Sequence, residues 1–379
     1  MKYFLIAGEP SGDMHGATLI AELIKNDPEA EIKYFGGDLM QAQGGQLLKH
    51  YNEMAFMGIL PVLFNIRTIQ KNFKACEEAL LQFKPNSLIL IDYPGFNLRM
   101  AKFAKLHGIP TSYYISPKVW AWKTKRVFKI KAWVDNMYTI FPFETNFFRK
   151  YDYEVTYVGN PVWDLIEKEL QNPLDFNSFI VKNNLENKPI IALLAGSRNA
   201  EISLLLPIME QVKPLFPSFQ FVIAGAPNKN SEYYRQILST EIPVVFNQTY
   251  DLLRYSRTAI VASGTATLET ALLNVPQVVV YKMGMGWFLE MFRKQILKTD
   301  FFSLVNLVAE KEVVKELFQS EVTPKNIKAE IDQILNNSDY KSQMLNGYAE
   351  IVENLKSEGA AVKAAKAIIA SIKRDTKNE

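Results

Sequence analysis

Short, continuous apolar segments alternate with amphipathic segments along the first half of the chain. The apolar segments, which we predict as strands, lie at residues 2–7, 87–91 and 109–116. The first is followed by a glycine-containing loop at residues 8–16 and by apolar side chains at helical spacing over residues 17–24. The second is followed in the same way by a loop at residues 92–97 and a helix near residues 99–107. Strands that are apolar on both faces and separated by helices favour a parallel sheet covered on both sides.

The second half of the chain repeats this pattern after an interruption. Asn-Pro and Asn-Asn pairs break the pattern between residues 160 and 188, and we place the domain boundary there, with domains at residues 1–170 and 171–349. Apolar residues on one face of a C-terminal helix of about residues 350–373 predict that it packs on another element, and we expect that element to belong to the first domain. Beyond the boundary, predicted strands lie at residues 190–194, 219–224, 258–262 and 277–281. The predicted fold class is α/β, with two doubly wound parallel-sheet domains.

The composition excludes several classes of protein. The chain has 379 residues with one cysteine and three histidines, so it forms neither an intramolecular disulfide nor a Cys/His zinc cluster. The longest uncharged segment, residues 214–228, is shorter than the roughly 18 to 20 apolar residues of a spanning helix. A formal charge of +3 is too small to indicate nucleic acid binding. The N-terminal residues lack the pattern of an export signal, so we expect a cytoplasmic protein.

Loops that follow the predicted strands carry the candidate chemistry, because ligands of open parallel sheets bind at the carboxyl ends of strands. In the first loop, Ser11 and Asp13 flank Gly12 near a helix start, where a substrate can approach the backbone closely. The alternative is a glycine turn with Asp13 as the helix N-cap. In the next loop, Asp92 directly follows a buried strand, where partial desolvation suits a carboxylate to take a proton from a hydroxyl. A structural turn is the alternative there.

Two loops of the second domain each predict an anion site at a helix N-terminus. Arg198 can bind a phosphate through two hydrogen bonds, or it can form a surface ion pair with Glu201. Glu269 lies one to two turns into the later helix and could reach ribose hydroxyls, although a plain capped helix is the alternative. The candidate nucleotide-binding residues are Gly196, Ser197, Arg198, Glu201, Ser263, Gly264, Thr265 and Glu269.

Residues 118–133 contain six Lys or Arg residues among aromatic ones and no acid, and residues 287–294 have a similar composition. Basic residues among aromatic residues are typical of contact with a membrane surface or an acidic lipid headgroup. A half-buried helix with a solvated basic face has the same composition. The candidate membrane-contact residues are Trp120, Trp122, Lys123, Arg126 and Lys129.

Several of these segments together resemble the lipid-A-disaccharide synthase family of inverting glycosyltransferases. The resemblance spans about residues 6–310, and its motifs occur in the order found in the family. Two positions depart from the family pattern, because Ala195 replaces a common proline and Gly95 stands where a second carboxylate is common. The matching motifs include Ser11-Gly12-Asp13, Met57-Gly58-Ile59, Ile91-Asp92, Tyr114-Ile115-Ser116-Pro117, Gly196-Ser197-Arg198, Ser263-Gly264-Thr265 and Asn306-Leu307.

The resemblance implies the GT-B architecture, in which two Rossmann-like domains face each other across a cleft. It implies transfer of 2,3-diacylglucosamine from UDP, with inversion, to the 6-hydroxyl of 2,3-diacylglucosamine 1-phosphate, giving the β(1→6) disaccharide of lipid A biosynthesis. Asp92 would act as the general base. A UDP-N-acetylglucosamine transferase or 2-epimerase of the same fold is the alternative, and a two-domain solute-binding protein would normally carry an export signal. The candidate acceptor-binding residues are Ser11, Gly12, Asp13, Met57, Ser116 and Asn306.

We expect no cofactor and no metal, because the chain has no Asp-x-Asp pair and no histidine cluster. Arg198 and the helix N-terminus at residues 263–265 would instead neutralise the leaving diphosphate. The expected partners are the lipid substrates and the inner-membrane surface, without nucleic acid, and an oligomer is compatible with the sequence. The expected location is therefore cytoplasmic, with peripheral association at the inner membrane.

Overall fold

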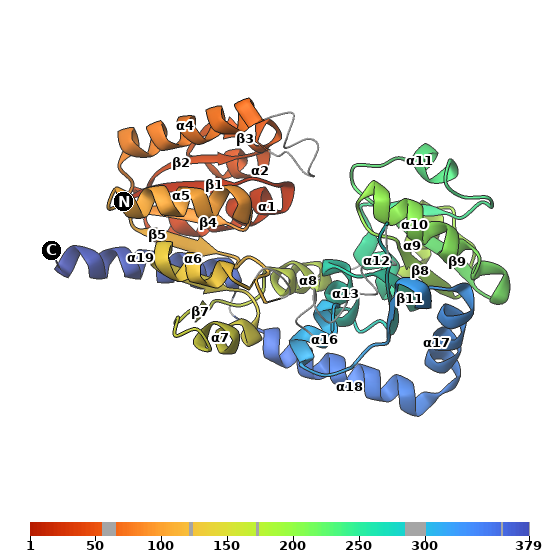
Figure 1. Ribbon diagram of the computed structural model, residues 1–379. Helices are drawn as coiled ribbons and strands as arrows, with labels where there is room; N and C mark the ends of the chain where they lie inside the picture. The colour runs from red at the N-terminus through yellow and green to blue at the C-terminus, as the bar shows by residue number, and fades with distance from the viewer. Residues whose placement is uncertain (55–65, 121–123, 172–173, 285–300, 358, 379) are drawn as a thin grey trace. The chain divides into compact units, whose positions relative to one another are not determined.

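The computed structural model describes residues 1–54, 66–120, 124–171, 174–284, 301–357 and 359–378. The chain forms two units, one made of Met1–Pro161 and Ser357–Glu379 and the other of Val162–Lys356. The first unit therefore ends before the boundary that we predicted after residue 170. Each unit is a parallel sheet flanked by helices (Figure 1), so the predicted fold class is confirmed.

The sheet of the first unit has the strand order β3-β2-β1-β4-β5-β6-β7, with all neighbours parallel. Its strands are β1 (Lys2–Ala7), β2 (Glu31–Gly36), β3 (Gln46–His50), β4 (Ser87–Ile91), β5 (Thr111–Tyr114), β6 (Asn136–Thr139) and β7 (Thr156–Tyr157). Its helices are α1 (Pro10–Asn26), α2 (Asp38–Gln43), η1 (Tyr51–Glu53), α4 (Ile66–Phe83), α5 (Pro94–Leu106), α6 (Arg126–Trp133), α7 (Pro142–Arg149) and α19 (Ala360–Asn378).

The sheet of the second unit has the order β10-β9-β8-β11-β12-β13 and is also parallel. Its strands are β8 (Ile190–Leu194), β9 (Gln220–Gly225), β10 (Val244–Phe246), β11 (Ser256–Ala262), β12 (Gln277–Tyr281) and β13 (Glu316–Phe318). Its helices are α8 (Pro161–Gln171, which begins at the junction), α9 (Phe176–Lys182), α10 (Asn199–Glu210), η2 (Lys213–Leu215), α11 (Ser231–Arg235), α12 (Thr249–Arg254), α13 (Thr265–Leu272), α16 (Leu304–Ala309), η3 (Gln319–Glu321), α17 (Pro324–Asn336) and α18 (Ser338–Leu355).

Both sheets change winding direction between their two central strands. In the first sheet this point lies between β1 and β4, which pair in parallel from Tyr3 with Ser87 to Ala7 with Ile91. In the second sheet it lies between β8 and β11. Ligands of doubly wound sheets bind at such switch points, outside the carboxyl ends of the strands. Each of the four loops chosen from the sequence follows one of these four strands.

Burial of the central strands matches their continuously apolar sequences. Residues 87–91 of β4 and residues 190–194 of β8 are buried throughout. Helices on both faces of each sheet therefore remove these side chains from water, at roughly 25 cal/mol per Å² of apolar surface.

Two helices begin earlier than the sequence pattern predicted. Helix α1 starts at Pro10, so most of the predicted loop at residues 8–16 is helical. A Cβ at Gly12 would lie 3.3 Å from the Cβ of Ala7, so glycine lets α1 approach the end of β1 closely. Helix α5 starts at Pro94, where proline is favoured in the first turn because it needs no hydrogen bond from its nitrogen.

The C-terminal segment returns to the first unit, where α19 packs on α1. The helix that packs there begins at Ala360 rather than near the predicted residue 350, because α18 ends at Leu355 within the second unit. The buried face of α19 consists of Ala360, Ala361, Ala364, Ala365, Ile368, Ile369 and Ile372.

Candidate functional site

The turn between β4 and α5 lies at the carboxyl edge of the first sheet and has an unusual backbone. Asp92 and Tyr93 both adopt left-handed conformations, with φ angles of 42° and 47°. A residue other than glycine in a sparsely populated region costs on the order of 1–3 kcal/mol. Such strain persists only where surrounding contacts impose it, and it is concentrated at functional sites.

Two side chains hold the backbone of this turn. The buried Tyr113 hydroxyl donates to the carbonyl oxygen of Asp92 at 2.5 Å, and Asn97 Nδ2 donates to the same oxygen at 2.7 Å. Tyr113 lies on β5, whose residues pair with β4, while Asn97 lies in the first turn of α5. The position of Asp92 is therefore fixed by the neighbouring strand and by the helix that follows.

The carboxylate of Asp92 has the electrostatic environment of a general base. Burial raises the pKa of Asp92, while the positive charge of Lys118 and the backbone N–H of Tyr93 partly lower it. A carboxylate with a raised pKa accepts a proton more readily than a fully solvated one. Lys118 lies in the loop after β5, so loops from two adjacent strands combine at this carboxylate.

The loop after β1 contacts this turn through a glycine. A Cβ at Gly8 would lie 2.1 Å from Cδ1 of Tyr93, so only glycine allows the tyrosine ring to pack against the end of β1. Ser11 is exposed in the first turn of α1, and Gly12 is buried beside it. The structure therefore brings the first two predicted loops together at the switch point.

Asp13 has a structural role that the sequence did not indicate. It is buried in the first turn of α1, whose N-cap is Glu9, so the alternative of Asp13 as the N-cap of its own helix is wrong. Its carboxylate caps α2 instead, accepting hydrogen bonds of 2.8 to 3.1 Å from the backbone N–H groups of Gly37, Leu39 and Met40. Acceptor binding by Asp13 stays a prediction.

The loop after β5 contains a further strained residue. Ile115 has a φ of 68°, which is an outlier for a β-branched side chain. The next residue, Ser116, is buried, and its hydroxyl donates to the Pro117 carbonyl oxygen at 3.1 Å. Acceptor binding by Ser116 stays a prediction.

Trp120 does not lie on the surface. Its side chain is 6% exposed, and its indole N–H donates to Oε1 of Glu144 at 3.2 Å. The other oxygen of Glu144 accepts from the backbone N–H groups of Ile140 and Phe141. Complete burial raises the pKa of Glu144 to about 7 despite these hydrogen bonds. The prediction of Trp120 as a membrane-contact residue is therefore wrong, because the side chain is buried and its indole N–H donates to the carboxylate of Glu144.

Three predicted residues, Met57, Trp122 and Lys123, lie outside the described residues, as does the second basic aromatic segment at 287–294. Arg126 and Lys129 lie on α6, where Arg126 is half-buried and Lys129 is exposed. Both line a groove between α5 and α6. The basic segment is thus divided between a buried end at Trp120 and an accessible end on α6.

The loop between β8 and α10 depends on Gly196. This residue has a φ of 99°, and a Cβ there would lie 2.5 Å from Oε2 of Glu201. Nη1 of Arg198 lies 3.5 Å from Oε1 of Glu201. The surface ion pair that was the alternative to phosphate binding is therefore present in the structure. The Arg198 side chain nevertheless remains 73% exposed, so its guanidinium is accessible to an anion. The loop residue Ser197 is also exposed.

The loop between β11 and α13 also lies at the carboxyl edge of the second sheet, because β11 is the parallel neighbour of β8. Gly264 is the N-cap of α13, and Thr265 is exposed in its first turn. The Ser263 hydroxyl donates to the carbonyl oxygen of Phe302 at 3.0 Å. One oxygen of Glu269 accepts a hydrogen bond from the Tyr250 hydroxyl at 2.9 Å, and burial raises the pKa of Glu269. The arrangement presents backbone N–H groups and small side chains to an anion.

Asn306 is a structural residue. It is fully buried, and its amide nitrogen donates to the Val314 carbonyl and to Glu316 at 2.9 and 3.0 Å. Its amide oxygen accepts from the backbone N–H groups of Val313 and Val314. The prediction that its side chain binds the acceptor is wrong in this structure, because all of its hydrogen-bonding capacity serves the loop before β13.

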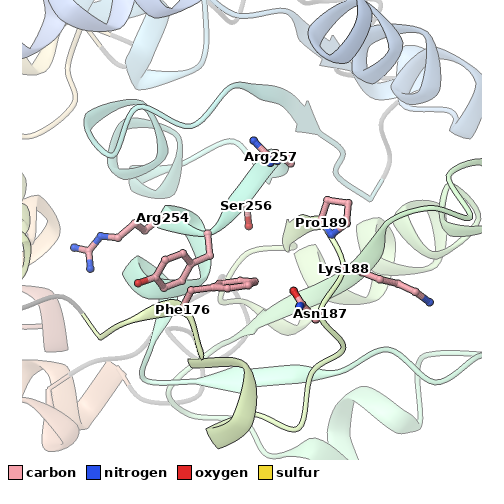
Figure 2. Close-up of a pocket in the computed structure, with 8 residues that line it drawn as sticks. Phe176, Asn187, Lys188, Pro189, Arg254, Ser256 and Arg257 are labelled. Atoms are coloured by element: carbon pink, nitrogen blue, oxygen red, sulfur yellow. The ribbon is translucent and has the colours of Figure 1, made fainter. Parts of the chain in front are cut away.

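A cavity of about 460 Å³ lies at the opposite end of the second sheet (Figure 2). Its lining includes Pro189 before β8 and Ser256 at the start of β11, together with Arg254. Because it adjoins the amino ends of these strands, it is separate from the loops that follow their carboxyl ends.

Sequence reasoning did not identify Lys118 or Tyr113 as neighbours of Asp92. Ligands of parallel sheets bind at the carboxyl ends of strands, and this rule, applied to the loop after the strand at residues 111–114, could have found Lys118. Tyr113 gave no signal, because a tyrosine within a strand is ordinarily a core residue.

Comparisons with known proteins agree on one family. The family model of lipid-A-disaccharide synthetase matches residues 3–369. The lipid-A-disaccharide synthase of Coxiella burnetii (strain CbuG_Q212) is 37% identical, with 96% of each chain covered, and that of Myxococcus xanthus (strain DK1622) is 38% identical, with 97% of each covered.

Solved structures agree with the fold. UDP-GlcNAc 2-epimerase from Neisseria meningitidis bound to UDP-GlcNAc has a TM-score of 0.66 at 16% identity, covering 99% of this chain and 100% of the epimerase. The calicheamicin glycosyltransferase CalG4 has a TM-score of 0.59 at 16% identity, covering 98% of both chains. These likenesses support the GT-B fold alone, whereas the sequence matches are specific: the chain belongs to the lipid-A-disaccharide synthetase family of glycosyltransferases.

Proposed function

We propose that this enzyme transfers 2,3-diacylglucosamine from UDP to the 6-hydroxyl of 2,3-diacylglucosamine 1-phosphate, with Asp92 as the general base. The single observation that carries the assignment of the base is the strained turn that fixes Asp92 at the switch point of the first sheet. Membership of the family supplies the substrates.

In the proposed reaction, the Asp92 carboxylate takes the proton of the acceptor 6-hydroxyl while that oxygen attacks the anomeric carbon of the donor. The new carbon–oxygen bond forms on the face opposite the bond to UDP, so the configuration inverts and UDP leaves. Negative charge develops on the diphosphate as it departs. Arg198 and the N-terminus of α13 supply compensating positive charge, because a guanidinium and free backbone N–H groups both stabilise phosphate oxygens.

We also propose that the protein works at the surface of the inner membrane, because both substrates carry acyl chains. On α6, Phe128 is 61% exposed among basic residues that include Lys129 and Lys131, which is a suitable composition for an anionic lipid surface. Among the described residues, no helix combines the length and the apolar character needed to cross a bilayer.

The test is incubation of the purified protein with UDP-2,3-diacylglucosamine and the acylated 1-phosphate acceptor in detergent, with measurement of UDP and disaccharide. We expect both products from the wild-type protein. The Asp92→Asn variant should lose roughly 10²-fold or more in turnover while it keeps its affinity for UDP. Asparagine adopts the left-handed conformation readily, so the turn should stay folded.

Asp152→Asn is the matched control, because Asp152 is an exposed aspartate of the same unit with a φ of 52°. Its turnover should equal that of the wild type. Near wild-type turnover of Asp92→Asn would remove Asp92 from the mechanism, and absence of both products from the wild-type protein would refute the proposed reaction.

A further inference from the structure

A basic groove of about 290 Å³ lies between α5 and α6 in the first unit. Four cationic side chains line it, two from each helix, together with the ring of Trp133 and the backbone of Gly95. The cationic residues are Arg99, Lys102, Arg126 and Lys129. Neither helix contains an acidic residue, so the groove concentrates positive charge between two facing elements.

Aromatic rings orient the cations of this basic groove. The ammonium groups of Lys102 and Lys129 lie 5.7 and 5.9 Å from the centre of the Trp133 ring, one from each helix. The guanidinium of Arg99 lies 3.8 Å from the centre of the Phe73 ring. An aromatic ring carries no net charge, so these three side chains keep their positive charge and can still bind an anion.

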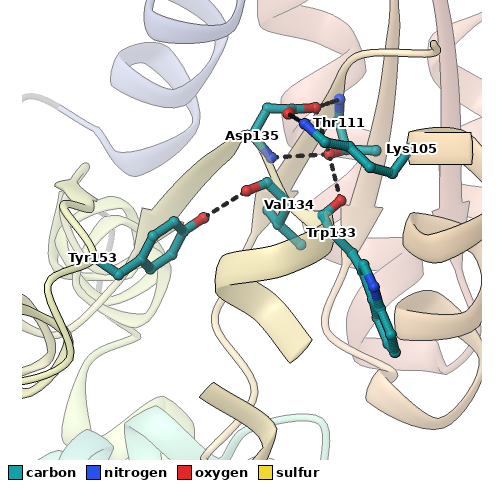
Figure 3. A network of polar contacts seen from close by, with 6 residues as sticks. All are labelled: Lys105, Thr111, Trp133, Val134, Asp135 and Tyr153. Carbon is teal, nitrogen blue, oxygen red and sulfur yellow. Dashed lines mark hydrogen bonds and ion pairs between the residues drawn. The ribbon is translucent and has the colours of Figure 1, made fainter. Parts of the chain in front are cut away.

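The position of Trp133 is fixed by a polar network at the end of α6 (Figure 3). The Thr111 hydroxyl donates to the Trp133 carbonyl oxygen at 3.1 Å, and the Asp135 carboxylate accepts the Thr111 backbone N–H at 2.9 Å. Lys105 forms an ion pair with Asp135 in the same network, so this lysine of α5 is engaged outside the groove. The end of α6 is thereby attached to β5.

The basic groove adjoins the turn that holds the proposed base. Pro94 and Gly95 line it, and Pro94 lies two positions after Asp92 in the chain. Arg126 also acts electrostatically on Tyr113, the residue whose hydroxyl holds the Asp92 carbonyl oxygen. A ligand anion in the groove would therefore lie beside the turn that carries Asp92.

We infer that the basic groove binds the phosphate monoester of the acceptor, and so positions the acceptor sugar with its hydroxyl toward Asp92. This inference rests on the proposed function. A phosphate monoester carries between one and two negative charges near neutral pH, more than the diester of an ordinary phospholipid, and it offers three oxygens to several donors. The place of the groove beside the turn that carries Asp92 favours the acceptor over a lipid of the surrounding bilayer.

The test compares two double variants that each remove two lysines from helices of the first unit. Lys102→Gln with Lys129→Gln changes the groove, whereas Lys25→Gln with Lys74→Gln changes exposed residues of α1 and α4 outside its lining. The groove variant should raise the KM for the phosphorylated acceptor roughly tenfold or more, since hydrogen bonds to charged groups are the strong ones. The KM for an acceptor without the phosphate, and the affinity for UDP, should match the wild type, as should every constant of the control variant.

The unfolding temperatures of both double variants establish whether they are folded. If the groove variant is not folded, the single change Lys102→Gln replaces it. An unchanged KM for the phosphorylated acceptor would overturn the inference. Weaker sedimentation with anionic vesicles at an unchanged KM would overturn it too, because the groove would then bind a membrane headgroup. If the wild type catalyses no transfer, the proposed function fails, and calorimetric titration of the phosphorylated acceptor into wild type and variants still decides the inference.

Discussion

Replacing Gly196 by alanine tests the conformation of the loop between β8 and α10. At a φ of 99°, alanine would be strained by about 1–3 kcal/mol, whereas glycine adopts this conformation freely. The new Cβ would also lie 2.5 Å from Oε2 of Glu201, so that carboxylate must shift, which weakens its 3.5 Å ion pair with Arg198. Because Arg198 is largely exposed, the ion pair contributes no more than about 1 kcal/mol.

The sum is a loss of about 1–4 kcal/mol in the free energy of unfolding. For a unit of this size, each kcal/mol lowers the unfolding temperature by roughly 2–4 °C, so we expect a decrease of about 2–16 °C by calorimetry. The displaced Glu201 carboxylate should also change the position of Arg198, and the KM for the UDP-sugar should rise roughly tenfold.

Gly264→Ala is the control for stability. Gly264 has an extended backbone, and a Cβ there meets none of the described residues within 4 Å. Its unfolding temperature should stay within about 1 °C of the wild type. A wild-type unfolding temperature and KM for Gly196→Ala, or an equal loss of stability for both variants, would refute the argument from backbone conformation.

Three further predictions concern metal, pH and the buried carboxylate. Turnover should survive EDTA, because Arg198 and the N-terminus of α13 supply the positive charge at the diphosphate; loss on chelation with recovery on adding Mg²⁺ would contradict this. Burial lowers the pKa of His15 to about 4, so its neutral form stabilises the fold above about pH 6.5 and this contribution is lost as the pH falls toward 4. His15→Leu should therefore remove up to about 2 kcal/mol of the stability difference between pH 7 and pH 5, measured by urea unfolding at both values. Trp120→Phe removes a donor to buried Glu144 and should lower stability by about 1–3 kcal/mol without changing vesicle binding; weaker vesicle binding would restore Trp120 as a membrane contact.

The central strands could be predicted from the sequence because they are apolar on both faces. β4 and β8 illustrate this, since every residue of each is buried. Strand β2 was missed because Glu31 and Lys33 interrupt its apolar residues, and they are tolerated because they are incompletely buried. The two-residue strand β7 is too short to give a periodic signal.

The candidate site was predictable where chemistry and chain position coincide. Asp92 and Arg198 directly follow predicted strands, so a rule about the carboxyl ends of parallel strands is enough to select them. Residues whose roles depend on distant partners were misjudged. Trp120 bonds to a carboxylate 24 residues away, and Asp13 caps a helix that begins 25 positions later, so no local pattern could show either contact.

The return of α19 to the first unit affects how the protein is made. On a ribosome that adds roughly 5–20 residues per second, the whole of residues 162–356 is synthesised between the body of the first unit and its last helix, which takes about 10–40 seconds. Throughout that interval, the surface of α1 that α19 later covers lacks its partner. The first unit must therefore wait for the second to emerge before its core is closed. A nascent chain that stalls within α18 would expose an apolar surface that a completed molecule keeps hidden, which makes such intermediates the species most prone to aggregation or to capture by a chaperone.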